Sequence, residues 1–209
     1  VANDAVEATG QLLASLERES YRRVGLGKVA DRFFLFHCGV GFDAAVVERV
    51  EARRSLKRIA PHPVFAATAF DSWLRTYDHR AGRFVVELDD GTTITGGTMA
   101  IVAKTSPYTF VGSRPIVVTP RAGLTTPLSL AVLKAHRAAP MLGLAARAII
   151  GQHGMGRSHA AVVRDGVEGL TITAADPIPH QADGEYLGEA TSLRFEHHPD
   201  CLTIVLPTA

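Results

Sequence analysis

The apolar positions near the start of the chain recur at helical spacing. Between Val6 and Leu16 they follow Asn3 and Asp4, either of which can cap a helix, and the pattern ends near Glu19. The same spacing predicts three further helices, over residues 43–59, 65–77 and 140–150. Helices are therefore expected mainly in the first third of the chain.

Short apolar or alternating runs, separated by turn signals, make up most of the remaining sequence. These runs predict strands over residues 21–29, 32–40, 83–88, 92–95, 97–103, 116–119, 128–134, 160–164, 170–173, 178–182, 186–187, 192–195 and 201–206. The predicted helices do not alternate regularly with these strands, which disfavours a doubly wound parallel sheet. We therefore predict an α+β fold that is mostly antiparallel β, a sandwich or barrel with flanking helices.

Composition narrows the function classes. The 209 residues are 46% apolar, and 22 Lys and Arg nearly balance 21 Asp and Glu. A chain so rich in apolar residues, with so little net charge, is not expected to be disordered. Nucleic-acid binding is not expected either, because phosphate contacts need an excess of Lys and Arg.

Two cysteines, Cys38 and Cys201, exclude a disulfide scaffold and a Cys-x-x-Cys zinc site. We expect both to be buried free thiols. No apolar run is long enough to span a bilayer, and no signal peptide is visible, so we expect a cytoplasmic protein. The chain starts abruptly at Val1, and we interpret it as part of a longer protein.

A glycine-rich turn follows the apolar run over 32–40. Residues 39–44 read GVGFDA, which fits G-x-G-x-x-A between a predicted strand and a predicted helix, the setting of a dinucleotide-binding turn. However, Asp43 would repel a pyrophosphate at the helix N-terminus, and a Pro-His-Pro segment replaces the expected second strand. We interpret the segment as a tight turn in which Asp43 caps a helix.

Two carboxylates flank a glycine near the end of the chain, at Asp183, Gly184 and Glu185. The simpler interpretation is a hairpin turn, because Asp-Gly suits positive φ. The chemical interpretation is a pair of acids that could accept a proton from a hydroxyl or help to hold a divalent cation. Spacing alone leaves both interpretations open.

Other candidate groups point to no site. The nine histidines lack metal-ligand spacing, so we predict no metal ligands among them. The basic residues of the second predicted helix, Arg53, Arg54, Lys57 and Arg58, are expected to form a solvated face, with contact to an anionic membrane as the alternative.

Three segments together resemble one family. Residues 36–47 read FHCGVGFDAAVV, residues 104–108 read KTSPY, and residues 179–185 read PHQADGE. In this order they resemble the lipid kinases of the diacylglycerol and sphingosine kinase type, whose first and third segments read N-x-G-x-G-x-D-A-x-V and P-x-Q-x-D-G-E. The resemblance covers nearly the whole chain.

The resemblance concerns the C-terminal half of the catalytic unit. It implies that residues 1–209 form a single C-terminal domain, β-sandwich-like as in the NAD kinases. It also implies that the nucleotide-binding half with its Gly-Gly-Asp-Gly-Thr loop lies outside these residues. We therefore expect this chain alone to have no appreciable kinase activity and to bind no cofactor.

Residue by residue, Asp183 matches the family's general base and Glu185 its acidic partner, while Gly184, Asp43 and Gly41 are expected to line the cleft. The implied reaction of the intact enzyme transfers the γ-phosphoryl group of ATP, with Mg²⁺, to the hydroxyl of a lipid such as diacylglycerol. Peripheral contact with a membrane and a homodimer remain open. So do an NAD kinase-like activity and a non-catalytic lipid-binding or regulatory role, whereas an oxidoreductase built on residues 39–44 is not expected.

Four positions depart from the family pattern. The family's L-x-D-G-x-L loop, where an Asp helps to hold a structural magnesium, reads LTTPL here, with Thr126 and Pro127 in place of Asp and Gly. A hard divalent cation requires charged oxygen ligands, so we predict no structural metal at this loop. Lys104 stands where the family often has Asn, and His37 where an Asn is common, so local hydrogen bonding is expected to differ.

Overall fold

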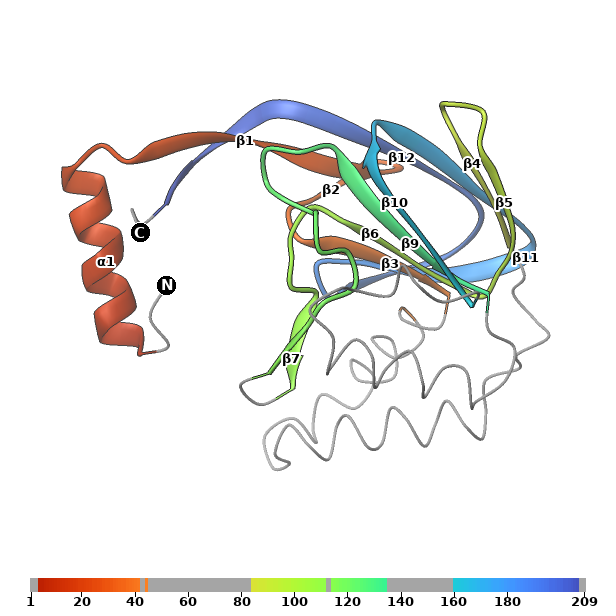
Figure 1. The fold of residues 1–209 in the computed structure, drawn as a ribbon, viewed down its shortest axis with the longest axis horizontal. Helices are drawn as coiled ribbons and strands as arrows, with labels where there is room; N and C mark the ends of the chain where they lie inside the picture. Colours follow the sequence, from red (N-terminus) through yellow and green to blue (C-terminus); the bar gives the residue numbers. More distant parts are fainter. Residues whose placement is uncertain (1–3, 42–43, 45–83, 112–113, 135–159, 207–209) are drawn as a thin grey trace.

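Helix α1 and strands β1 to β12 are seen in the computed structural model, which describes residues 4–41, 44, 84–111, 114–134 and 160–206 (Figure 1). In chain order they are α1 (Ala5–Glu17), β1 (Tyr21–Val29), β2 (Arg32–Phe34), β3 (His37–Gly41), β4 (Phe84–Leu88), β5 (Thr93–Gly97), β6 (Met99–Ala103), β7 (Thr109–Val111), β8 (Arg114–Ile116), β9 (Leu128–Leu133), β10 (Ala161–Val167), β11 (Gly169–Ala182) and β12 (Glu185–Val205).

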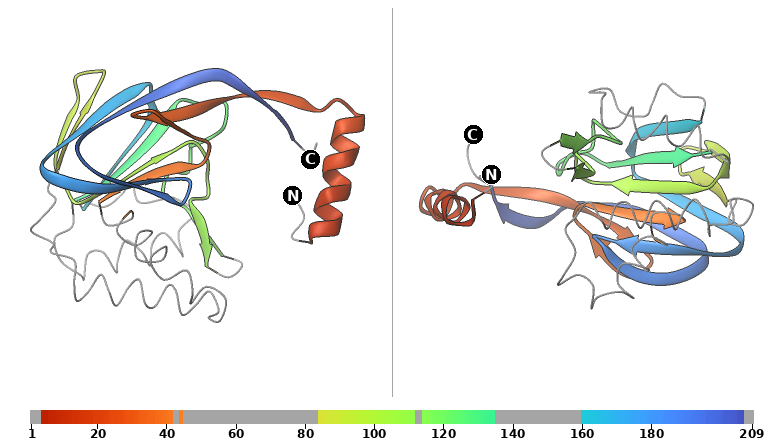
Figure 2. Two further views of the ribbon diagram at one scale, coloured as in Figure 1. Left: turned by 180° about the vertical axis from the view of Figure 1, so that it is seen from behind. Right: turned by 90° about the horizontal axis from the view of Figure 1, so that it is seen from below.

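Ten of these strands form one antiparallel sheet. Its main path runs β10-β9-β6-β3-β11-β12-β1-β2, while β4 pairs with β11 and with β5. Strands β7 and β8 form a separate hairpin. The views in Figure 2 show the large sheet bent over on itself into two layers. The predicted α+β, mostly antiparallel fold is therefore confirmed.

Strand β11 connects the two layers because it changes partner along its length. Its residues 170–174 pair with β4, and its residues 180–182 pair with β3. Between Thr173 and Ile178 the register with β12 shifts, next to Pro177, which has no N–H to give to a neighbouring strand. The segment around Pro177 therefore bends β11, and the last residues of the strand pair with β3.

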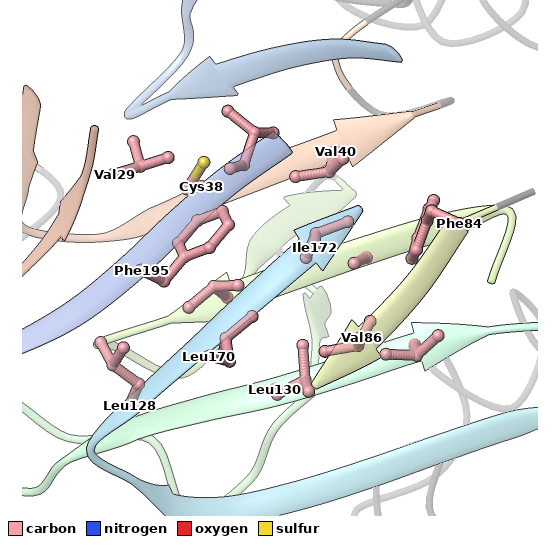
Figure 3. Packing of buried hydrophobic residues seen from close by; sticks show 14 of the residues in the cluster. Val29, Cys38, Val40, Phe84, Val86, Leu128, Leu130, Leu170, Ile172 and Phe195 are labelled. Carbon is pink, nitrogen blue, oxygen red and sulfur yellow. The ribbon is translucent and has the colours of Figure 1, made fainter. Parts of the chain in front are cut away.

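The core lies between the two layers (Figure 3). Its largest fully buried side chains include Phe34, Phe84, Phe195, Leu170 and Ile172. They alternate with exposed positions, as in the pattern of β4, because successive side chains of a strand point to opposite faces. Removal of this apolar surface from water is the main term that favours the fold.

Helix α1 lies at the far end of a ribbon formed by β1 and the last part of β12, away from the sandwich (Figure 1). The carboxylate of Asp4 caps it by accepting hydrogen bonds from the N–H groups of Val6 and Glu7, both at 3.0 Å. Its apolar stripe remains exposed, with Val6 81% and Leu13 55% accessible.

Some predicted elements differ from the observed ones. The single strand predicted over 32–40 is divided by a bend at residues 35 and 36 into β2 and β3. The strand predicted over 116–119 is wrong beyond Ile116: Val118 and Thr119 are buried but unpaired in any strand, so the pattern detected burial rather than pairing. Cys38 is buried and forms no disulfide, as expected, but Cys201 is exposed because it lies on the ribbon, outside the two layers.

Apart from Ala44, the predicted helices over 43–59, 65–77 and 140–150, with Asp43 and the basic residues at 53–58, lie outside the described ranges.

Candidate functional site

The acidic segment forms the hairpin turn between β11 and β12. Asp183 and Gly184 are the two turn residues, with φ of 49° and 84°, and Glu185 begins β12. Positive φ at both central residues is the geometry that matches the right-handed twist of paired strands. The local interpretation of Asp-Gly as a hairpin turn is therefore confirmed.

The carboxylate of Asp183 is held by backbone N–H groups from the bend between β2 and β3. Its Oδ2 accepts from Leu35 N–H at 2.7 Å, and its Oδ1 accepts from Phe36 and His37 N–H at 2.9 and 3.0 Å. The Asp183 N–H in turn donates to the His37 carbonyl at 2.9 Å. A carboxylate offers about four lone-pair positions, so one on Oδ2 remains for another donor.

Sheet pairing brings two of the sequence motifs together. His180, Gln181 and Ala182 of β11 lie opposite Val40, Gly39 and Cys38 of β3. Gln181 is 1% exposed, and its Oε1 accepts the Gly184 N–H at 2.8 Å, which fixes the turn from its buried side. The PHQADGE and GVG segments therefore lie on adjacent strands inside the sheet.

Glu185 contacts the same part of the chain as Asp183. Its carboxylate forms an ion pair with Arg32 of β2, and the two side chains are 55% and 54% exposed. A pair this exposed contributes little to stability, because water and salt screen it. Both acids therefore contact residues 32–37, the first by backbone hydrogen bonds and the second through an exposed ion pair.

Gly41 ends β3 in a conformation that favours glycine. Its φ is +79°, and a Cβ at this position would lie 2.6 Å from the carbonyl oxygen of Thr98. The close approach of these backbones explains the glycine without a ligand. The setting of a dinucleotide-binding turn is also missing, since β3 pairs antiparallel with both β6 and β11.

His180 lies in β11, three residues before Asp183. It is buried, and burial lowers the pKa of its imidazole, while a hydrogen bond with the Gly188 backbone acts in the opposite direction. Its spacing in the sequence gave no reason to single out His180, because its burial depends on the neighbouring strands. The N–H donors of residues 35–37 could not be predicted from the sequence either, because they are backbone groups.

Within the described ranges, no three His, Cys, Asp or Glu side chains are placed to hold a metal ion. No helix there is long and apolar enough to cross a membrane. One surface hollow is lined by Asp89, Asp90, Arg164 and Asp165, among others, and adjoins the start of β11. The acidic turn follows the end of the same strand, so the hollow is not part of the site.

Comparison with known families decides what this domain is. Residues 37–206 match the model of the YegS C-terminal NAD kinase beta sandwich-like domain. The chain belongs to this family. Both motif segments of the site, at 37–41 and 179–185, lie inside the region of the YegS C-terminal domain, whereas α1, β1 and β2 precede it.

Solved structures support the same fold. A diacylglycerol kinase from Bacillus anthracis strain Sterne is 12% identical with a TM-score of 0.58, over 91% of this chain and 56% of that one. Two candidate diacylglycerol kinases from the same strain are each 13% identical, with TM-scores of 0.65 and 0.61, over 91% of this chain and 58% and 59% of theirs. A search of curated proteins finds no match.

The YegS C-terminal domain described here therefore spans less than two thirds of the length of these solved chains. The expected β-sandwich fold and the resemblance to the C-terminal half of diacylglycerol kinase-type lipid kinases are confirmed. The assignment of individual site residues stays a prediction.

Proposed function

We propose that the intact protein is an ATP-dependent lipid kinase that transfers a phosphoryl group to the hydroxyl of a lipid such as diacylglycerol. In this proposal the YegS C-terminal domain supplies the acidic turn that receives the hydroxyl. The observation that carries the proposal is the anchored carboxylate of Asp183, at the position that matches the family's general base.

Phosphoryl transfer depends mostly on positioning and charge neutralisation. Three N–H groups hold the Asp183 carboxylate in one orientation, so little side-chain entropy is lost when a substrate arrives. The remaining lone pair of Oδ2 would orient the acceptor hydroxyl and take its proton late in the transfer. The proton would move from the lipid oxygen to Asp183 as that oxygen bonds to the γ-phosphorus of ATP, while the bond from this phosphorus to the ADP oxygen breaks and ADP leaves.

Glu185 would act beside this base. Its ion pair with Arg32 is more than half exposed, so the carboxylate can exchange this partner for another cation. ATP with Mg²⁺ would supply the phosphoryl group and neutralise its charge. In this proposal the cation arrives with the nucleotide, and within the described ranges no three His, Cys, Asp or Glu side chains are placed to hold a metal ion.

The proposal is tested on the intact protein with ATP, Mg²⁺ and diacylglycerol in vesicles, by measurement of the phosphorylated lipid. Asp183→Asn should lower the rate by roughly 10² or more, because it removes the proton acceptor. Asp176→Asn is the matched control, since Asp176 is an exposed acid of β11 outside the turn, and it should leave the rate unchanged. A normal rate in Asp183→Asn would reject the assignment.

The acceptor class is tested in the same assay by a comparison of diacylglycerol with NAD. Lipid phosphorylation without NAD phosphorylation is the expected result, and the reverse would favour an NAD kinase-like enzyme. The 209-residue chain alone should turn over no ATP. Turnover by this chain would contradict the proposal that the nucleotide-binding half lies outside these residues.

A non-catalytic lipid-binding or regulatory role is the second candidate. It is favoured by one observation: three hydrogen bonds of the Asp183 carboxylate serve the fold itself. This role predicts that the intact protein binds lipid vesicles but forms no phosphorylated lipid.

A further inference from the structure

A lysine is fully buried beside the loop for which the sequence predicts no metal. Lys104 follows β6, and its side chain has no exposure to water. Its ammonium group donates a hydrogen bond to the carbonyl oxygen of Thr126. A buried cation is costly unless it is paired or hydrogen-bonded, so its position requires an explanation.

The loop that Lys104 reaches has the backbone of a tight turn. The carbonyl oxygen of Gly123 accepts from both the N–H and the hydroxyl of Thr126, at 3.1 and 3.0 Å. The neighbouring carbonyl of Leu124 accepts the Gly25 N–H of β1 at 2.9 Å. The turn is therefore held on one side by β1 and on the other by Lys104.

These contacts do not suit a divalent metal ion at the loop. A hard divalent cation would need charged oxygen ligands, and Thr126 offers a hydroxyl that already donates within the turn. The one backbone oxygen that faces a cation, that of Thr126, already faces the ammonium group. The structural magnesium that the family resemblance implies does not fit the residues present.

We propose that the Lys104 ammonium is a built-in cation that holds the 123–127 turn in place of a divalent metal. The same residue also reaches the acidic turn through its backbone: Lys104 N–H donates to the Phe36 carbonyl at 2.8 Å, and Phe36 N–H donates to Asp183. Lys104 therefore joins the 123–127 turn to the bend that carries Asp183. The domain keeps this connection whether or not magnesium is present. The proposal is independent of the proposed kinase activity.

Burial has the largest effect on the charge of Lys104 and lowers the pKa of its amine, while interactions with Cys201 and Glu168 act to raise it. The acid Glu168 therefore favours the charged form that a carbonyl oxygen binds most strongly.

Amide hydrogen exchange on the intact protein tests the proposal without nucleotide. In the wild-type protein, the Gly25 and Thr126 amides should show the same protection in millimolar Mg²⁺ and in excess chelator. Lys104→Met keeps most of the length of the side chain and removes its charge and donors. It should raise exchange at these two amides roughly tenfold or more, the factor that corresponds to loss of about one hydrogen bond.

Lys134→Met is the matched control, because Lys134 is a partly buried lysine just after β9, at the end of that strand away from the turn. It should leave both amides unchanged. Greater protection of these amides by Mg²⁺ in the wild-type protein would overturn the proposal, and so would an unchanged exchange rate in Lys104→Met. If Lys104→Met does not fold, the comparison of Mg²⁺ with chelator in the wild-type protein decides by itself.

Discussion

Replacement of Asp183 by Asn should destabilise the domain as well as slow any reaction. The carboxylate accepts three backbone N–H bonds, two on Oδ1 from Phe36 and His37 and one on Oδ2 from Leu35. An amide side chain has one acceptor oxygen, so it can keep the Oδ1 pair but turns an NH₂ donor toward the Leu35 N–H. One hydrogen bond to a charged acceptor is lost, and two donors face each other.

A hydrogen bond to a charged group contributes roughly 1.5–3 kcal/mol to stability. At this chain length each 1 kcal/mol lowers the unfolding midpoint by about 2–4 °C, so Asp183→Asn should lower it by roughly 3–12 °C. Thermal unfolding followed by circular dichroism or calorimetry measures this shift. Any rate comparison for this variant belongs well below its lowered midpoint, where the protein is still folded.

Glu185→Gln is the internal control for this stability measurement. It removes a charge two residues away, but its pair with Arg32 is about half exposed and contributes roughly 0–1 kcal/mol. Asp183→Asn should therefore destabilise the domain clearly more than Glu185→Gln. Equal midpoints for the wild-type protein and Asp183→Asn would refute the view that the bend at residues 35–37 holds this carboxylate.

Two further predictions concern Gly41 and His180. Gly41→Ala places a methyl group 2.6 Å from the Thr98 carbonyl oxygen at a φ of +79°. It should therefore lower the free energy of unfolding by on the order of 1–3 kcal/mol or more. Denaturant titration measures this loss, with Gly10→Ala in the exposed helix α1 as the control. Because the pKa of His180 is lowered in the folded state, its imidazole is protonated near pH 6.5 in the unfolded chain but only at a lower pH in the folded chain. Stability should therefore fall as pH decreases from about 6.5 through the lowered pKa of His180, by at most about 1.4 kcal/mol per pH unit for this residue, and His180→Gln should remove that part of the slope. An identical pH dependence in wild type and His180→Gln would contradict the assignment.

Local chemistry in the sequence was enough to locate the candidate site. Asp-Gly predicts a turn with positive φ, and that turn is observed at Asp183 and Gly184. Asp4 caps α1 as its position predicts. The strand predicted over 32–40 and the strand predicted over 116–119 were less accurate, because apolar runs signal burial, and only a partner strand decides pairing.

What the sequence alone determined is therefore local: the turns, the first cap, the alternation of the strands and the order of the family motifs. The tertiary structure decided what each group contacts. The N–H groups that hold Asp183 come from residues 146 to 148 positions earlier, and Lys104 reaches Thr126 only because β6 ends beside that loop. Backbone donors are identical at every residue, and burial depends on which strands become neighbours. No pattern along the chain can therefore show which carboxylate the backbone N–H groups bind or which lysine becomes buried.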